Sequence, residues 1–235
     1  MTAYQHRRNI IKMIEEIGRR HHRWQVFSDF VESAAICISN TVDLANFVER
    51  EKRFEDIKSK YEKAEHDRFP EMFSELVLAM EDETHDALGM LFHELELHNK
   101  YVGQFFTPYS LCKMIATLTT EELPPSGYVS VLEPACGAGA MLIAKAMALL
   151  EAGINPQKHM HATAVDIDQK CVHMTYVQLS LLGIPAIVIH GNTITLEEWH
   201  HWRTPMHILG LWDTRHPECE IIKPGTPIIE QLNLL

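Results

Sequence analysis

The sequence predicts an α/β protein in which a helical N-terminal region precedes a Rossmann-like layer. Apolar residues recur at helical spacing from residue 3 to about residue 97, and short apolar runs alternate with helical segments after Lys100. The first of these runs ends in an acid and a Gly-x-Gly turn. Such a turn brings bare backbone N–H groups to a helix N-terminus, where they can bind a carboxylate or phosphate. The sequence therefore predicts a site for a small anionic or zwitterionic ligand.

Composition is that of a soluble globular protein. The chain has 235 residues, of which 46% are hydrophobic and 23% charged. Because no apolar run is long enough to span a bilayer and the N-terminus has no signal-peptide core, we expect a cytoplasmic location. Five scattered cysteines without a Cys-x-x-Cys pattern indicate reduced thiols. The histidine pairs at 159/161 and 200/201 lack matching ligands, so no metal site is expected.

The net charge of −11 opposes nonspecific binding to DNA, because such binding depends on neutralising phosphates with Lys and Arg. The first 25 residues are the exception. Their basic residues are Arg7, Arg8, Lys12, Arg19, Arg20 and Arg23. This cluster is either a solvated helix face or a nucleic-acid contact, and the sequence leaves both open.

Helical spacing defines the first region, which we delimit as a helical domain of residues 1–100 before an α/β domain of residues 101–235. The periodic apolar residues include Ile10, Ile14, Ile17, Val26, Phe27, Phe30, Val31, Leu44, Phe47, Phe54, Ile57, Met72, Phe73, Leu76 and Met80. Pro70 interrupts the pattern and suits the first turn of a helix.

Strands and helices alternate in the second region, which predicts a parallel sheet with crossover helices. The expected strands are Tyr128–Leu132, His161–Val165, Ala186–His190 and Met206–Trp212, and the expected helices are Ser110–Thr119, Ala140–Leu150 and Gln169–Leu182. A ligand should then bind at the carboxyl ends of the strands, beside the first strand.

Four segments follow one another in a characteristic order. They are Gly103–Pro108 (GQFFTP), Leu132–Gly139 (LEPACGAG), Ala164–Asp168 (AVDID) and Gly191–Thr193 (GNT). Leu142 replaces the third glycine of a dinucleotide fingerprint, which disfavours NAD. In this order and spacing the segments resemble the S-adenosylmethionine (SAM) site of adenine-specific DNA methyltransferases, typified by the modification subunit of type I restriction-modification systems. The resemblance spans about residues 84 to 193.

This resemblance implies SAM as the cofactor and a set of contacts with it. The implied cofactor-binding residues are Phe105, Thr107, Glu133, Ala135, Gly137, Gly139, Asp166, Ile167 and Asn192. Asp166 would accept the ribose hydroxyls, Asn192 would bond the adenine edge, and Glu133 with the glycine turn would hold the methionyl head. Glu133 could instead cap a helix, and the Phe105–Phe106 pair could instead pack between domains. Asp168 is expected to be an N-cap.

One motif of that family is missing. Its members carry Asn-Pro-Pro-Phe or Asn-Pro-Pro-Tyr, sometimes with Asp or Ser first, at the end of the fourth strand, where it accepts hydrogen bonds from the target amine and stacks on the flipped base. The Pro-Pro pair of this chain, Pro124-Pro125, precedes the glycine turn. Asp213 is the candidate for a substitute acceptor, with Trp212 as the stacking platform. The sheet also looks shorter than the seven strands of a complete methyltransferase.

Two functions of different classes follow from these observations. The first is a DNA adenine-N6 methyltransferase, or a subunit that depends on a partner chain for DNA contact and for part of its catalysis. The second is a pseudoenzyme that keeps SAM, or only the fold, and acts through contacts of its helical half, which could form a homo- or hetero-oligomer.

Overall fold

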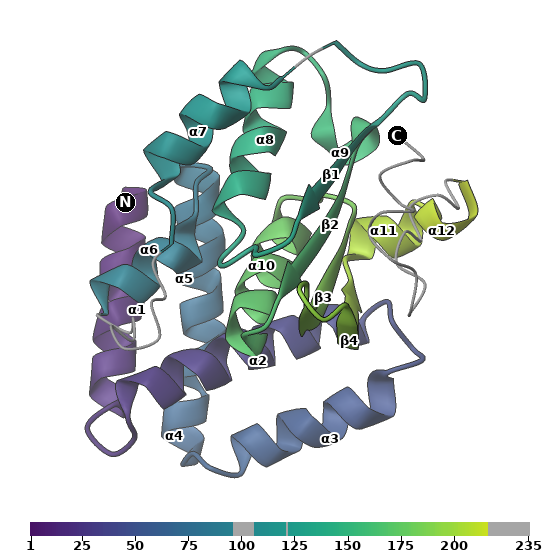
Figure 1. The fold of residues 1–235 in the computed structure, drawn as a ribbon. Coiled ribbons are helices and arrows are strands. Elements are labelled where there is room, and N and C mark those ends of the chain that lie inside the picture. Colours follow the sequence, from purple (N-terminus) through teal and green to yellow (C-terminus); the bar gives the residue numbers. More distant parts are fainter. Residues whose placement is uncertain (96–105, 121, 216–235) are drawn as a thin grey trace.

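The computed structural model describes the chain apart from residues 96–105, 121 and 216–235. Helices fill its first part, as the apolar spacing predicted (Figure 1). They are α1 (Ala3–Ile17), α2 (Arg23–Asn40), α3 (Phe47–Lys58), α4 (Lys63–His66), α5 (Arg68–Asp82) and α6 (Ala87–Glu94). Thr2 begins α1 through a capping box with Gln5. Pro70 lies in the first turn of α5, where its missing N–H costs no helical hydrogen bond.

A mainly parallel sheet follows. Its strands are β1 (Val129–Glu133), β2 (Met160–Asp166), β3 (Ala186–Asn192) and β4 (Glu197–Arg203). They lie in the order β1-β2-β3-β4, with β1, β2 and β3 parallel and β4 antiparallel to β3. The intervening helices are α7 (Tyr109–Leu118), α8 (Ala140–Glu151), α9 (Pro156–His159) and α10 (Gln169–Leu181). The predicted helical region and the short Rossmann-like sheet are both present in the described residues. The expected domain division at residue 100 falls outside them.

The predicted strand Met206–Trp212 is wrong. That segment forms α11 (Pro205–Leu209) and α12 (Trp212–Arg215), while the fourth strand is the preceding segment, Glu197–Arg203. Pro205 stands at the first position of α11, where its fixed φ favours a helix. The actual strand escaped prediction because β4, which pairs only with β3 in the described sheet, buries little, so its sequence can be mostly polar.

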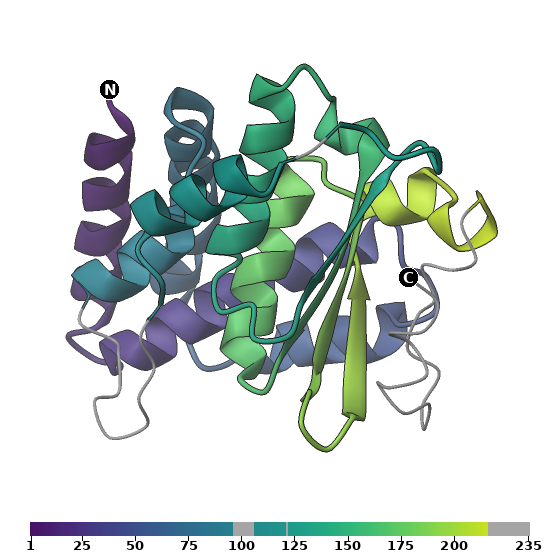
Figure 2. The same ribbon diagram turned by 45° about the horizontal axis from the view of Figure 1, so that its top comes forward.

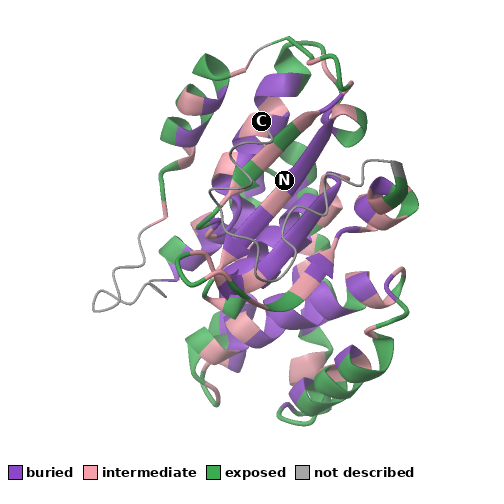
Figure 3. Ribbon diagram, turned by 45° about the vertical axis from the view of Figure 1, so that its right-hand side comes forward, coloured by how far each residue is buried: buried purple, intermediate pink, exposed green. Residues whose placement is uncertain are grey.

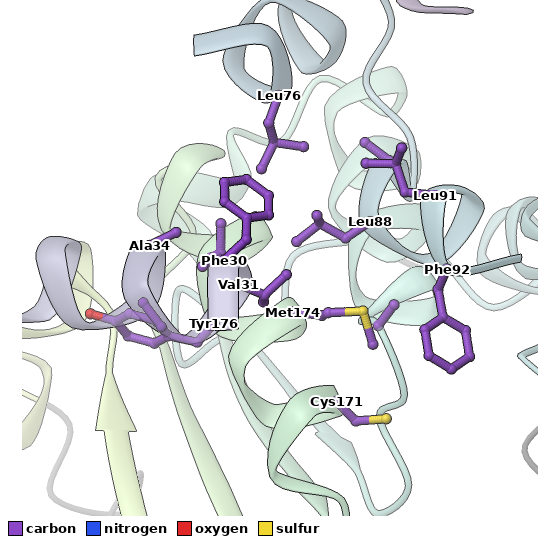
Figure 4. Close-up of a cluster of buried hydrophobic side chains, with 14 of the residues drawn as sticks. Phe30, Val31, Ala34, Leu76, Leu88, Leu91, Phe92, Cys171, Met174 and Tyr176 are labelled. Carbon is purple, nitrogen blue, oxygen red and sulfur yellow. The ribbon is translucent and has the colours of Figure 1, made fainter. Parts of the chain in front are cut away.

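The molecule has three layers (Figure 2). Helices α8 and α10 cover one face of the sheet, and the N-terminal helices pack on the far side of α10. One hydrophobic core joins these layers. Figure 4 shows part of it, where Phe30 and Val31 of α2 approach Leu88 of α6 and Met174 and Tyr176 of α10. Because α10 is buried on both sides, it holds the sheet in place against the helical region. No helix among the described residues has the length and apolarity needed to cross a membrane.

Candidate cofactor site

The carboxyl ends of three parallel strands carry the polar residues of the candidate site. Glu133 ends β1, Asp166 ends β2 and Asn192 ends β3. In the strand register, Glu133 lies opposite Ala164 and Asp166 lies opposite His190. The three side chains therefore lie together at the carboxyl ends of the strands, which is where α/β proteins bind their ligands.

The turn after β1 depends on its two glycines. Gly137 and Gly139 have φ angles of +54° and +92°, which residues with a side chain rarely adopt. A Cβ on Gly137 would lie 3.1 Å from Cδ1 of Phe106, and one on Gly139 would lie 3.1 Å from Oγ1 of Thr175. Gly139 is also the N-cap of α8. The glycines thus let the backbone N–H groups at the start of α8 face the strand ends, where an anionic group can bind.

Asp166 connects β2 to this turn. Its Oδ2 accepts a hydrogen bond from the Gly137 N–H at 2.8 Å, and its Oδ1 accepts one from the Asp168 N–H at 2.9 Å. A carboxylate offers about four lone pairs, so Asp166 can still accept hydroxyl groups from a ligand. Asp168 caps α10 by accepting from the Lys170 N–H at 2.9 Å, which confirms its expected role.

Glu133 and Asp166 are two partly buried acids in one small region. Burial raises the pKa of the Glu133 carboxyl, and the negative charge of Asp166 raises it further. Burial also raises the pKa of Asp166, although the N–H groups of Asp168 and Gly137 oppose this. Glu133 Oε1 accepts a hydrogen bond from the Ala135 N–H at 3.4 Å. No side chain caps the N-terminus of α8, so the alternative role of Glu133 as a helix cap is not observed. A ligand that carries positive charge would stabilise both ionised groups.

The end of β3 completes the edge. Asn192 turns its Oδ1 toward the N–H groups of Ile194 and Thr195, at 2.9 and 3.2 Å, which leaves its amide nitrogen suited to donate to a ligand. Thr193 Oγ1 donates to the Pro134 carbonyl at 2.6 Å and so ties β3 to the turn after β1. Ile167 is exposed beside Asp166 and offers an apolar surface at the same edge.

Aromatic residues lie beside the glycine turn. The Phe106 ring packs against Phe92 and His93 of the α6 region, with ring centroids 5.0 and 5.5 Å away, and it faces Gly137. It therefore both packs on the helical region and lines the turn. Thr107 follows it and is exposed, as is Ala135. Phe105 lies outside the described residues.

The site also depends on a buried polar network that the sequence did not predict. Gln178 of α10 is 0% exposed and donates to the Ala138 carbonyl at 2.7 Å and to Asp86 Oδ1 at 2.8 Å. Its Oε1 accepts the Leu88 N–H at 3.1 Å. Thr175, one turn earlier, donates to the Gly137 carbonyl at 3.0 Å. The signal was present in the sequence, because Thr175 and Gln178 fall on the helix face of buried Cys171 and Met174.

The placement of Asp213 contradicts its candidacy as an acceptor. Because β4 is antiparallel to β3, the chain after Arg203 continues from the amino end of the sheet, opposite the cofactor edge. There Asp213 Oδ1 accepts a hydrogen bond from His207 Nε2 at 2.9 Å. Trp212 is 4% exposed and packs on Tyr128 and His161, so it offers no face to a base.

The fold is a Rossmann-type sheet with polar side chains at three neighbouring strand ends, the position where sheets of this class bind nucleoside cofactors. A model of the N-6 DNA methylase family matches residues 81–209. The chain therefore belongs to the N-6 DNA methylase family, whose cofactor is SAM.

Comparison with solved structures gives a weak likeness, and no curated protein matches the chain. The structure found is of a protein from Listeria monocytogenes described as a class I S-adenosylmethionine-dependent methyltransferase. It has 19% sequence identity and a TM-score of 0.42, over 72% of this chain and 54% of that one. This chain thus spans about half the length of that protein.

The residues at the strand ends fit SAM by the chemistry of their donors and acceptors. The two carboxylates match the cationic ammonium and the ribose hydroxyls, the start of α8 matches the ligand's carboxylate, and Asn192 with Ile167 matches a polar-edged ring. Bound SAM supplies an electrophilic methyl group. The chain's part is to orient the cofactor, and the individual contacts stay predictions.

We expect SAM affinity to fall when the pH is lowered from about 7 to about 5. Only ionised carboxylates attract the cation, and because burial raises the pKa values of Glu133 and Asp166, protonation begins at a higher pH than for exposed acids. Ligand-free stability should respond in the opposite sense, since a raised folded-state pKa contributes stability that is lost as pH rises. Calorimetry at several pH values measures the affinity. Glu133→Gln should bind more weakly with a flatter pH profile, and an affinity that rises in acid would contradict the assignment.

Proposed function

We propose that this chain is the SAM-binding part of a DNA adenine-N6 methyltransferase, and that it transfers methyl groups only together with a partner subunit. The observation that carries the proposal is the mismatch between the two halves of the reaction. The donor side has a full set of candidate residues at the strand ends. The acceptor side has no candidate among the described residues, because Asp213 lies at the opposite edge of the sheet.

The charge distribution of the chain also favours a partner subunit that contacts DNA. Two residues of the N-terminal basic cluster already pair within the chain: Arg7 is buried against His85 and Glu94, and the exposed Arg20 forms an ion pair with Glu62. With a net charge of −11, the chain has little capacity to neutralise phosphates by itself. A partner that binds DNA would supply the positive charge that neutralises the phosphates, as in a restriction-modification assembly. The outward surface of the helical region is a second place where subunits could associate.

The lone chain is expected to show only background methylation of DNA. The target amine of adenine is a poor nucleophile, and without positioned acceptors the electrostatic and proximity contributions to catalysis are lost. Transfer of labelled methyl from SAM to genomic DNA, assayed with and without candidate partner subunits, tests this expectation.

The matched control for that assay is Asp213→Ala, which should leave the background unchanged. Robust transfer by the lone chain, abolished in this variant, would contradict the proposal and make Asp213 the acceptor. A second candidate function, a protein that has lost SAM binding and acts only through protein contacts, is tested by calorimetry with SAM. No heat and no thermal shift at millimolar ligand would favour it.

A further inference from the structure

A cavity of about 410 Å³ lies in the helical region, between α2, α3, α4 and α5 (Figure 1). Its lining residues fall between Phe30 and Phe73, so it shares no residue with the candidate cofactor site. An apolar cavity of about 150 Å³ is enough to hold benzene, and ligand pockets in proteins span about 300–1,000 Å³. The cavity is therefore large enough for a molecule of two fused rings.

Helix α3 covers this part of the bundle with few buried residues. Its buried residues are Arg50 and Ile57, and Figure 3 shows most of this helix as exposed. Arg50 is fixed by Asp43 Oδ2 at 2.7 Å and by the His201 carbonyl at 2.9 Å. Phe54, which lies between the two buried residues, is half-buried and lines the cavity. These two anchors hold α3 in place without filling the space between it and the neighbouring helices.

The walls of the cavity are apolar and reach into the core. Phe30 of α2 and Phe69 of α5 are 1% and 4% exposed, and their rings meet edge to face with centroids 6.1 Å apart. Phe54 and Phe73 add two half-buried rings. A helix laid on the surface of the bundle would not reach walls that are buried so deeply, whereas a small molecule would. Aromatic walls attract the edges and faces of a flat aromatic molecule.

Two polar atoms in the wall have no hydrogen-bond partner in the part of the chain that the structure describes. They are Ser33 Oγ and His66 Nε2, and both atoms are buried. Burying such an atom without a partner costs free energy, which a ligand recovers when it supplies the missing hydrogen bond. The Ser33 hydroxyl can donate or accept, and a neutral imidazole nitrogen does one or the other according to its tautomer. A ligand hydroxyl group complements both atoms.

Charges around the cavity favour a neutral ligand. In the described structure no lysine, arginine, aspartate or glutamate lines it. Burial lowers the pKa of His66 and Lys58 lowers it further, so the imidazole is neutral at about pH 7. Lys58 itself is paired with Glu55 at 2.9 Å. A carboxylate in the cavity would be a buried charge without a cation beside it, which is costly.

We propose that this cavity is a second ligand site, which takes a small neutral aromatic molecule that carries a hydroxyl group. The rings of the ligand pack between the phenylalanines, and its hydroxyl group bonds to Ser33 Oγ and His66 Nε2. A bound molecule adds contacts from α3 and α4 to α2 and α5, where the free chain has a void. The site goes beyond the proposed function, because it requires neither SAM nor DNA.

Equilibrium dialysis of the full chain with three naphthalene compounds tests the chemistry of the site. Naphthylmethanol carries the hydroxyl group, methylnaphthalene lacks it, and naphthoate carries a negative charge. Ser33→Ala should weaken the binding of naphthylmethanol about threefold to tenfold, because one hydrogen bond is lost, and should leave methylnaphthalene within about twofold. Naphthoate should bind the parent chain at least about tenfold more weakly than naphthylmethanol.

The thiol of Cys37 reports whether the cavity is the place of binding. It is exposed and lines the cavity. Burial raises the pKa of this thiol and Glu51 raises it further, so alkylation is followed at mildly alkaline pH, with the label located by mass spectrometry. Naphthylmethanol at about ten times its Kd should slow the alkylation of Cys37 about tenfold.

A variant that fills the cavity is the second control. Ala34 of α2 lines the cavity, so the ring added by Ala34→Phe takes the place of the ligand. This variant should bind none of the three compounds. Ala152→Phe adds the same ring at an exposed position after α8 and should bind them as the parent does. Circular dichroism checks that each variant is folded, and Ser33→Ala, which removes one oxygen atom, keeps the test valid if Ala34→Phe does not fold.

Four results would overturn the site. They are no binding of naphthylmethanol by the parent, equal losses of naphthylmethanol and methylnaphthalene in Ser33→Ala, binding that a folded Ala34→Phe leaves unchanged, and no alkylation of Cys37 in the ligand-free chain. The last result would show that another part of the chain already covers the cavity. Protection of Cys37 together with a loss confined to naphthylmethanol in Ser33→Ala would establish it.

Discussion

Replacing Asp166 with alanine is expected to weaken SAM binding by about 1.5–3 kcal/mol, the range for hydrogen bonds to a charged group. The carboxylate is expected to accept ribose hydroxyls, and it accepts a hydrogen bond from the Gly137 N–H at 2.8 Å, which holds the glycine turn. Losing both effects should lower SAM affinity more than replacing an exposed acid with alanine would. Isothermal calorimetry on the folded variant, with folding checked by circular dichroism, measures the change.

Asp168→Ala is the matched control, because Asp168 is the neighbouring acid and caps α10 without bonding the glycine turn. It should cost about 1 kcal/mol of stability, as loss of an N-cap does, and leave SAM affinity nearly unchanged. Equal affinities for Asp166→Ala and the parent would remove Asp166 from the site.

Replacing Gln178 with leucine is expected to lower the free energy of unfolding by about 2–4 kcal/mol. The side chain is fully buried and satisfies the Ala138 carbonyl, the Leu88 N–H and Asp86 Oδ1 together. Leucine would leave these groups buried with partners removed, and Asp86 already has a pKa raised by burial. Urea denaturation measures the loss. SAM affinity should fall as well, because the turn from Cys136 to Gly139 loses one of its supports.

The same substitution at an exposed glutamine is the control. Gln157 Nε2 donates to the Leu182 carbonyl at 3.0 Å in an exposed position, where water can replace the bond. Gln157→Leu should therefore change the free energy of unfolding by less than about 1 kcal/mol. Similar losses for the two variants would show that the buried hydrogen bonds of Gln178 contribute no more to stability than a hydrogen bond at the surface.

These two variants separate the two supports of the site. Asp166 holds the glycine turn from the sheet side, and Gln178 with Thr175 holds it from α10. Asp86, at the start of α6, joins the second support to the helical region. The helical region therefore stabilises the cofactor turn directly, in addition to any role in association.

Local signals were sufficient for most of the secondary structure. The strands β1, β2 and β3 and the helices α7, α8 and α10 lie within a residue or two of their predicted bounds, because buried strands and amphipathic helices have clear apolar patterns. The short helix α9 was not predicted. The pattern was misleading after Thr204. There a Pro-initiated helix is apolar enough to resemble a strand, and the real edge strand is polar.

The sequence by itself determined the family, the order of the site segments and the need for glycine at positions 137 and 139, because short motifs specify backbone conformation and local chemistry. The tertiary structure decided which residues meet. It revealed that Gln178 and Asp86, which are 92 residues apart in the sequence, together support the glycine turn. It also showed that the antiparallel direction of β4 places Asp213 at the amino ends of the parallel strands, away from the candidate cofactor site. It also left β1 at one edge of the described sheet. Strand order and direction arise from long-range pairing and packing, and no local pattern of residues encodes them.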